Sequence, residues 1–440
     1  MRFLPVFRGT GRAANPAVFL ALPDLPRLQE NRESLPSCLG KGIGRMARTV
    51  ILAGARTPFG KLGGALSGLT AAQLGGIAIK ETLKRGNTDP EEVEHVILGT
   101  VLQGGQGQLP SRQALRLAGL PWKTRTETIN KVCASGMRSV AIADLLIRSG
   151  EAEVAVAGGM ESMSNAPYIL PDARFGYRMG DSSIKDLMIY DGLTCSFTGV
   201  HMGHYGNLAA RELKITRERQ DEWALRSHRR AVAALDSGRL AEEIVPVEVP
   251  GKKGTVHVVK EDEGPRRDTS LEKLAALKPA FDPDGTITAG NAPGVNDGAC
   301  AMLLASETYA ERKGLKPLAY LIAGAEVAVP AKDFPKTPGL VIKEILKKTG
   351  KAEEEIDLYE INEAFAAVAL ASIQIAGIDP EKVNVNGGAV ALGHPIGASG
   401  ARIILTLAYE LKRRGGGIGV AAICSGGGQG DAVMIEVPKQ

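Results

Sequence analysis

Cys133-Ala-Ser-Gly136-Met-Arg138 has a counterpart late in the chain, His394-Pro-Ile-Gly-Ala-Ser-Gly400-Ala-Arg402, and both contain the pattern Ala-Ser-Gly-x-Arg. Each pattern opens a run typical of a helix, followed by a glycine turn and an apolar strand, at 154–157 in one copy and 418–423 in the other. A duplicated α/β unit is the simplest explanation. A cysteine precedes the first helix and a histidine precedes the second. If the copies pack about a pseudo-twofold axis, both helix starts face one pocket, as a cysteine nucleophile and its base require.

Strands and helices alternate in two parts of the chain, which predicts an α/β fold with a mostly parallel, doubly wound sheet. We expect helices on both faces of two packed sheets. The predicted parts are a leader over 1–45, an N-terminal half over 46–163 with about 295–316, a loop domain over 164–294 and a C-terminal half over 317–440. Strands are predicted over 50–53, 93–100, 154–157, 318–323, 358–361, 418–423 and 432–437 and at Asn384, helices over 70–84, 111–117, 216–237, 339–349 and 365–376, and a hairpin around 251–254.

The composition excludes several classes of protein. The chain has 440 residues, 44% of them hydrophobic, and a net charge of +4 from 53 basic and 49 acidic residues. This balance argues against a nucleic-acid-binding protein, and no apolar run approaches the length of a membrane span. The five cysteines are an odd number and contain no Cys-x-x-Cys pair, so neither a disulfide framework nor structural zinc is expected. A reducing compartment, the cytoplasm, is favoured.

Residues 1–45 differ from the rest of the chain in composition. They contain five prolines and scattered arginines without sustained periodicity, and we expect a disordered leader that does not pack. Met46 resembles a natural start, which would make the leader upstream or misassigned translation. A transit peptide, and with it a mitochondrial location, is the alternative, but the leader is poor in serine and contains acidic residues. A functional segment is the third interpretation.

Cys133 and His394 are the first candidates for chemistry. Cys133 stands at the start of a predicted helix, where unpaired N–H groups and the helix dipole favour a thiolate and can bind an oxyanion. The alternative is a small buried apolar side chain. His394 lies in a loop too rich in glycine and proline for a helix. His394 either forms a hydrogen bond within its own turn or acts as the catalytic base for Cys133. Its predicted position opposite a cysteine at a helix start favours the catalytic base.

Cys424 and Asn362 each follow an apolar strand. Cys424 opens Cys-Ser-Gly-Gly-Gly-Gln-Gly, which has the glycines of a dinucleotide-binding loop, but residues 431–437 continue as a strand where such a loop would need a helix. A hairpin turn is the structural alternative. Asn362 precedes an alanine-rich helix and is either its cap or a ligand contact at the carboxyl end of a strand.

Four motifs occur together in one order and spacing: Cys133-Ala-Ser-Gly136, Asn362-Glu-Ala-Phe365, Gly393-His-Pro-Ile-Gly-Ala-Ser-Gly400 and Cys424-Ser-Gly-Gly-Gly-Gln-Gly430. This set resembles the thiolases, specifically the acetyl-CoA acetyltransferase type that makes and cleaves acetoacetyl-CoA. The resemblance runs from about Met46 to the C-terminus. It implies a thiolase-like, duplicated, layered α/β/α/β/α core with an inserted loop domain.

The resemblance also implies roles for the motif residues. Cys133 would be the nucleophile that becomes acylated, His394 would activate it, and Cys424 would be the second acid/base. Asn362 would hold a water that forms one oxyanion hole with His394, and the N–H groups of Cys133 and Gly426 would form the other.

Binding of the CoA substrates is implied for residues of the loop domain and its neighbours. Arg266 would stack on the adenine. Two positions depart from the family pattern, since Pro293 replaces a serine that bonds the pantetheine and Phe334 replaces a methionine near the acyl pocket. The implied CoA-binding residues are Leu193, His201, Met202, Arg266, Phe281, Ala289 and Gly290.

The resemblance implies acetyl-CoA, acetoacetyl-CoA and CoA as partners, no metal or separate cofactor, and a homodimer or homotetramer. A 3-ketoacyl-CoA thiolase of broader chain length is an alternative. β-Ketoacyl synthases and hydroxymethylglutaryl-CoA synthases pair their cysteine with two histidines or with a histidine and an acid, and Cys424 argues against both. A non-catalytic CoA- or lipid-binding scaffold would be expected to lose Cys133, His394 or Cys424.

Overall fold

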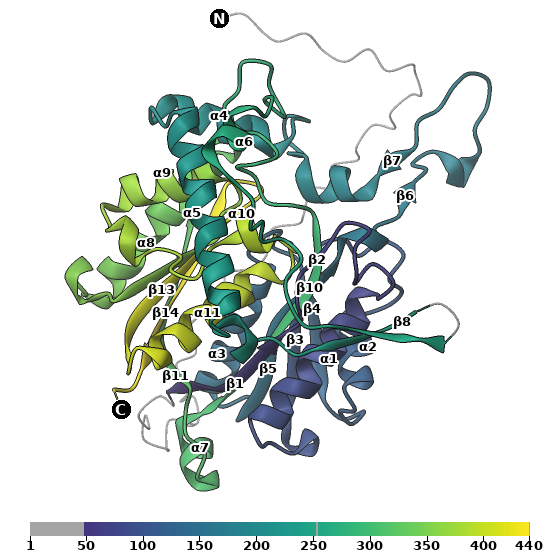
Figure 1. Cartoon of the computed structure of the whole chain (residues 1–440). Helices are drawn as coiled ribbons and strands as arrows, with labels where there is room; N and C mark the ends of the chain where they lie inside the picture. The colour runs from purple at the N-terminus through teal and green to yellow at the C-terminus, as the bar shows by residue number, and fades with distance from the viewer. Residues whose placement is uncertain (1–47, 252–253, 440) are drawn as a thin grey trace, which may run out of the picture. The chain divides into compact units, whose positions relative to one another are not determined.

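A ten-stranded mixed sheet lies at the centre of residues 48–251 and 254–439, the residues that the computed structural model describes (Figure 1). The predicted leader lies outside them. Along the sheet the order is β12-β13-β14-β11-β1-β10-β5-β3-β4, and β2 pairs with β10. The strands are β1 (Thr49–Arg56), β2 (Gly60–Lys61), β3 (His95–Gly99), β4 (Arg125–Ile129), β5 (Val154–Ser162), β10 (Asn296–Ser306), β11 (Ala319–Ala328), β12 (Leu358–Ile361), β13 (Gly417–Ser425) and β14 (Gln429–Val437).

The expectation of mostly parallel, separate sheets was wrong. Only β3–β4, β3–β5 and β12–β13 pair in parallel within the central sheet of the described residues. The short turn between β13 and β14 enforces an antiparallel pair, because parallel neighbours need a long crossover. The two halves also join edge to edge, where Val50 of β1 lies opposite Tyr320 of β11.

The helices form three layers around the two halves of the sheet, which confirms the layered α/β prediction. Helices α1 and α2 pack on the outer face of the first half, and α8 and α9 on the outer face of the second (Figure 1). Helices α3 and α11 share one apolar core with strands of both halves and so lie between them. These helices are α1 (Ala71–Arg85), α2 (Pro110–Leu117), α3 (Ser135–Ser149), α8 (Thr337–Thr349), α9 (Ala366–Ala376) and α11 (Ser399–Arg413), and shorter ones are α7 (Glu307–Lys313) and α10 (Ala389–Leu392).

The glycines of the two repeats let α3 and α11 touch at their first turns. A Cβ on Gly136 would lie 2.9 Å from the backbone nitrogen of Ala401, and a Cβ on Gly400 would lie 2.5 Å from the backbone nitrogen of Met137. Real side chains do not approach so closely, so both positions require glycine. The repeated sequence therefore brings the two helix starts together, as predicted.

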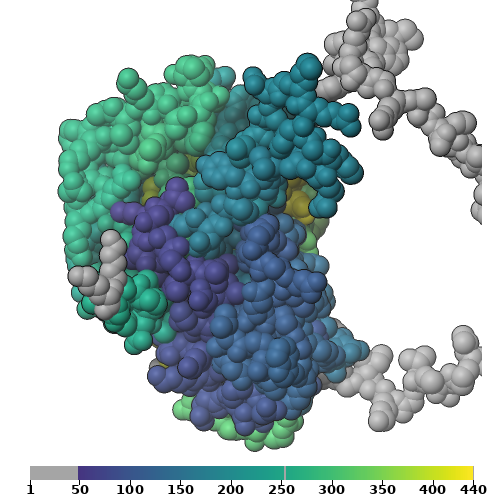
Figure 2. All heavy atoms as spheres, turned by 90° about the vertical axis from the view of Figure 1, so that its right-hand side faces the viewer, coloured from purple at the N-terminus to yellow at the C-terminus, as the bar shows by residue number. Residues whose placement is uncertain are grey.

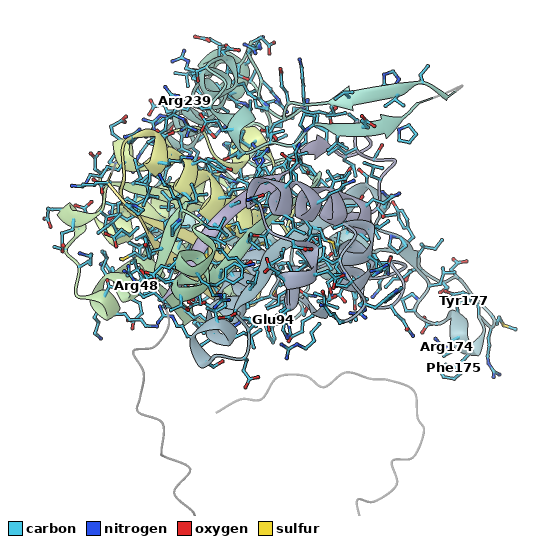
Figure 3. The ribbon with its side chains drawn as sticks, turned by 90° about the horizontal axis from the view of Figure 1, so that it is seen from below. Arg48, Glu94, Arg174, Phe175, Tyr177 and Arg239 are labelled. Atoms are coloured by element: carbon cyan, nitrogen blue, oxygen red, sulfur yellow. The ribbon has the colours of Figure 1, made fainter. Side chains whose placement is uncertain are left out.

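Residues 164–294 contain small elements outside the central sheet. Buried Arg56 of β1 anchors this stretch, because it pairs with Glu243 and Asp262 at 2.6 Å each. A two-stranded ribbon, β6 with β7, extends away from the sheet, and Figure 3 labels Arg174, Phe175 and Tyr177 near its end. The elements are β6 (Tyr168–Ile169), β7 (Lys185–Asp186), α4 (Met202–Glu212), α5 (Arg217–Asp236), β8 (Val247–Pro250), β9 (Val256–Val259) and α6 (Leu271–Ala275).

The strand predicted at Asn384 was wrong. Asn384 has a φ of 48°, which is left-handed backbone, and its side chain bonds both backbone groups of Ile361. Val383 makes one isolated parallel bridge with Tyr359 of β12, and the left-handed backbone of Asn384 ends it, so no strand forms there. No described helix is long and apolar enough to cross a membrane.

Candidate active site

A cavity of about 260 Å³ lies beside the starts of α3 and α11. Most of its wall is apolar, and the reactive side chains interrupt that wall at a few points, which is typical of a small-molecule site. Sequence analysis missed Met163, and it assigned no binding role to three other wall residues that lie within the quoted motifs, Ala364, Phe365 and Ile396. The sequence-predicted residues in the wall are Cys133, Leu193, His201, Met202, Phe281, Phe334, His394 and Gly426, together with Pro293.

Cys133 sits in a tight turn just before α3. Val132 has a φ of 45°, an uncommon conformation for a β-branched residue, and it turns the chain so that Cys133 faces the cavity. Burial raises the pKa of the Cys133 thiol to about 12, although the N–H groups of Gly426 and Cys133 itself point at the sulfur and oppose the shift. In the free site, burial therefore opposes the thiolate that the helix start favours.

His394 is buried and held on both sides. Its Nδ1 lies 2.6 Å from the Ser399 hydroxyl, which itself bonds the carbonyl of Pro395 at 3.0 Å, and its backbone N–H donates to Asn296 at 2.9 Å. Because the Ser399 hydroxyl donates its hydrogen to Pro395, its oxygen accepts a hydrogen bond from the Nδ1–H of His394, and the lone pair of the ring is on Nε2. Burial and then the charge of Arg402 lower the pKa of His394 to about 3. His394 is thus a neutral base at physiological pH.

Asn362 faces His394 from the end of β12. Its Nδ2 lies 3.5 Å from His394 Nε2, and its fully buried Oδ1 has no partner. An unpaired buried amide oxygen costs free energy unless a water or ligand reaches it. Asn362 Oδ1 is therefore free to bind the water that the family resemblance implies. The cap interpretation was wrong, because α9 begins after Phe365 without a side-chain cap.

Cys424 lies near the end of β13, is not among the residues that line the cavity, and is 0% exposed. Burial raises the pKa of its thiol well above the usual range, and the neighbouring Cys133 raises it further, so the two sulfurs are close. The glycines that follow form a β13–β14 hairpin turn, as expected, and not a dinucleotide loop. Ser425 Oγ bonds the carbonyl of Lys131 at 2.5 Å, which ties this hairpin to the turn that carries Cys133.

A second cavity, of about 230 Å³, adjoins the first. The two share Ala292, Gly294 and Val295 as wall residues. Of the residues predicted to hold CoA, exposed Arg266 and Ala289 line this second cavity. Gly290 lines neither and is buried, because a Cβ there would meet Leu274 at 2.5 Å.

Sequence analysis missed the carboxylate that holds the histidine loop. Glu161 is fully buried, and burial raises its pKa to about 7 although hydrogen bonds oppose the shift. It connects segments far apart in sequence, so no local pattern marks it. Glu161 accepts from the N–H of Gly397 at 2.9 Å, of Val101 at 2.9 Å and of Leu102 at 3.1 Å and from the hydroxyl of Thr100 at 3.0 Å. Sequence analysis also assigned no role to Ser399, which holds the His394 ring. Its place as the serine of the second Ala-Ser-Gly repeat was the signal that could have identified it.

Comparison with known proteins gives one result. Residues 49–308 match the family model described as thiolase, N-terminal domain, and residues 315–437 match thiolase, C-terminal domain. A probable acetyl-CoA acetyltransferase of Mycolicibacterium smegmatis is 50% identical over 386 residues, which cover 88% of this chain and 100% of the relative. The acetyl-CoA acetyltransferase of Escherichia coli is 48% identical over 392 residues, with 89% and 99% covered. A crystal structure of the Bacillus anthracis acetyl-CoA acetyltransferase matches with a TM-score of 0.88 at 43% identity and covers 89% of this chain and 99% of that one.

Proposed function

Because the chain belongs to the thiolase family, we propose that it is an acetyl-CoA acetyltransferase, which condenses two acetyl-CoA molecules to acetoacetyl-CoA and CoA and catalyses thiolysis in reverse. Relatives that are 50% and 48% identical carry this name. The observation that supports it most is the neutral, buried His394 at the same cavity as Cys133, with the Cys424 thiol near Cys133. A base and a thiol at one apolar cavity, with a second thiol nearby, suit acyl transfer followed by carbon–carbon bond formation.

In the proposed first half-reaction, Cys133 takes the acetyl group. His394 Nε2 accepts the proton of the Cys133 thiol as the sulfur attacks the thioester carbonyl. The carbonyl oxygen becomes an oxyanion, and the N–H groups of Cys133 and Gly426, which point at the sulfur, stabilise it. The C–S bond to CoA then breaks, and Cys424 gives its proton to the departing CoA sulfur.

In the proposed second half-reaction, the Cys424 thiolate takes a proton from the methyl group of a second acetyl-CoA. Protonated His394 and a water on Asn362 Oδ1 donate to the enolate oxygen. The enolate carbon attacks the acyl group on Cys133, and the Cys133 sulfur leaves and regains its proton from His394. Protons balance over the cycle, and both thiols end protonated, as their raised pKa values require.

Rival members of the superfamily fit the site less well. A β-ketoacyl synthase or a hydroxymethylglutaryl-CoA synthase would place a second histidine or an acid where Cys424 lies. A non-catalytic scaffold would not need an oriented base beside a nucleophile. The observation that favours a thiolase over these alternatives is the second thiol, because Cys133 lies close enough to Cys424 to raise its pKa and the condensing mechanism above uses both thiols.

We further propose that the acyl pocket is short, so that acetoacetyl-CoA is preferred to longer 3-ketoacyl-CoAs. Aromatic rings close the cavity, because His201 stacks on Phe281 at 4.3 Å and Phe281 meets Phe365 edge-on at 5.9 Å. Buried Phe334 lines the same cavity. Each methylene misfit in an apolar pocket is worth about 1–3 kcal/mol, so a ten-carbon substrate should have a much lower kcat/KM than the four-carbon one. Equal values would contradict the short pocket and favour the broader 3-ketoacyl-CoA alternative.

We also propose a homo-oligomer, a dimer or tetramer, in a reducing compartment such as the cytoplasm. The β6–β7 ribbon exposes large apolar side chains, among them Phe175 at 88% exposure, and Figure 3 shows this residue on the ribbon away from the sheet. Such a cluster on a projecting segment is typical of a protein–protein contact. Light scattering on the purified protein, with Phe175→Ser as the variant, tests this assembly. A wild-type monomer would contradict it.

The direct test of the activity uses the purified protein with no other enzyme. We expect release of free CoA from acetyl-CoA and CoA-dependent cleavage of acetoacetyl-CoA. Both activities should disappear in Cys133→Ala while the melting temperature is retained. Absence of both activities in the wild type would overturn the proposal.

A further inference from the structure

The second cavity has an electrostatic character that the reactive cavity lacks. Lys61, His228 and Arg266 line it, and no acidic side chain does. It adjoins the reactive cavity through the shared wall at 292–295. An apolar cavity of about 260 Å³ can take the acyl and thioester end of a substrate, but burying charged phosphates there would cost too much free energy. The charged half of the substrate must therefore lie elsewhere.

Lys61 projects from a rigid part of the backbone. It lies in β2 opposite Asn296 of β10, and its N–H donates to Glu263 at 2.8 Å. The same Asn296 accepts from the N–H of His394, so Lys61 stands at a fixed place relative to the base. Its side chain is exposed, and among the described residues it has no ion-pair partner. Figure 2 shows the violet start of the described chain, which includes β2, on the surface beside green atoms.

His228 of α5 supplies a neutral donor to the same cavity. It is only 3% exposed, and its Nδ1 accepts from the backbone N–H of Arg266 at 3.1 Å. Nδ1 therefore carries the lone pair, and Nε2 carries the hydrogen. No described residue bonds that Nε2. Burial, and then the charges of Arg266 and Lys61, lower the pKa of His228 to about 4, so the ring is neutral and both cations lie near it.

These groups match one ligand chemistry. A phosphate ester combines negative charge with several acceptor oxygens, and lysine, arginine and N–H donors are the groups that bind it. We propose that the Lys61 ammonium group and the Nε2–H of His228 bind a phosphate group of the CoA thioester, next to Arg266. The pantetheine arm then passes the shared wall at 292–295 to bring the thioester to Cys133. This subsite rests on the proposed function, because it assumes a CoA substrate.

The test compares substrates with and without phosphates. Lys61→Met should raise the KM for acetyl-CoA about 5–10-fold with little change in kcat, and it should leave the KM for acetyl-pantetheine, which carries no phosphate, unchanged. His228→Phe should act in the same direction, and His228→Gln, which keeps an N–H donor, should restore most of the affinity. Lys343→Met removes the same charge from an exposed site on α8 and should change neither KM.

An unchanged KM for acetyl-CoA in Lys61→Met would overturn the subsite, and so would an equal change with both thioesters. Dephospho-CoA thioester identifies the phosphate, because the Lys61→Met effect disappears with it only if the 3′-phosphate is the one bound. A wild-type protein that turns over neither thioester would instead contradict the proposed function. The two failures are therefore distinguishable.

Discussion

The starts of α3 and α11 have the same three residues, Ala-Ser-Gly, but the two serines make different hydrogen bonds. Ser135 Oγ accepts from the N–H of Lys131 at 2.8 Å and donates to the carbonyl of Val132 at 2.6 Å, so it fixes the backbone of the turn that presents the cysteine. Ser399 Oγ makes the equivalent bond to Pro395 but uses its acceptor side for the ring of His394. One repeat therefore orders a backbone turn, and the other sets a tautomer.

Burial shifts the two reactive groups in opposite directions. It raises the pKa of Cys133 to about 12 and lowers the pKa of His394 to about 3. The cause is the same, because each environment disfavours the charged form of its group. The pair therefore rests as thiol and neutral imidazole, and the charges arise only as substrate reacts. A helix start alone therefore does not make a thiolate.

The arginines of the two repeats also differ. Arg138 pairs with Glu326 near the surface, whereas Arg402 is fully buried and pairs with Glu360 at 3.0 Å. Two nitrogens of Arg402 have no partner, and its charge lowers the pKa of His394. Of the two repeat arginines, Arg402 is therefore the one that is buried and acts on the pKa of its reactive group.

The largest expected effect comes from removing the base. His394→Gln should lower kcat about 10³-fold, within the usual range for general acid–base catalysis. KM should change little, because the substitution removes the base and leaves the other residues of the cavity wall in place. A steady-state assay with acetoacetyl-CoA and CoA measures both constants. A loss of less than tenfold would show that the histidine half does not supply the base.

The next effect tests the contact between the two helix starts. Gly400→Ala places a Cβ 2.5 Å from the backbone nitrogen of Met137. It should lower the free energy of unfolding by about 1–3 kcal/mol, as overpacking does, and should lower kcat because Cys133 and His394 move apart. Gly68→Ala, where no atom lies within 4 Å, is the matched control. Equal stability of the two variants in urea unfolding would contradict the close contact of α11 with α3 at Gly400.

The lowered pKa of His394 predicts a pH dependence of stability. The folded pKa is about 3, whereas an unfolded histidine titrates near 6.5. Below pH 6.5 the unfolded chain binds a proton that the folded chain does not, so stability falls as the pH falls towards 3. His394→Gln should remove about 2 kcal/mol of this loss at pH 5. If wild type and His394→Gln lose equal stability between pH 7 and pH 5, His394 is not a buried neutral base.

The smallest effect separates the roles of the two serines. Ser399→Ala should lower kcat about tenfold, the lower end for a residue that orients a reactive ligand, and should leave KM unchanged, because the tautomer of His394 is no longer fixed. Ser135→Ala should instead destabilise the turn around Cys133. Nitrogen NMR of the histidine rings reports the tautomer. An unchanged tautomer in Ser399→Ala would contradict the assignment.

The sequence predicted the parts of the molecule that depend on local pattern. Helix 216–237 is charged on one side and apolar on the other, helix 365–376 and strand 358–361 are apolar runs, and the family motifs identified residues around the reactive cavity. Three features were missed because distant segments create them. Glu161 joins four backbone or hydroxyl groups of other segments, β2 pairs with β10, and the pKa of Cys133 depends on burial by the whole fold.

The proposed mechanism makes Cys133 the acyl carrier and Cys424 the second acid/base. Acyl labelling tests this assignment most directly. Each variant is incubated with radioactive acetyl-CoA, and the label bound to protein is counted after denaturation. We predict that Cys133→Ser takes up almost no label, whereas Cys424→Ser becomes labelled but condenses poorly. The wild type should show ping-pong kinetics. Equal labelling of Cys133→Ser and wild type would contradict the assignment of Cys133 as the acyl carrier.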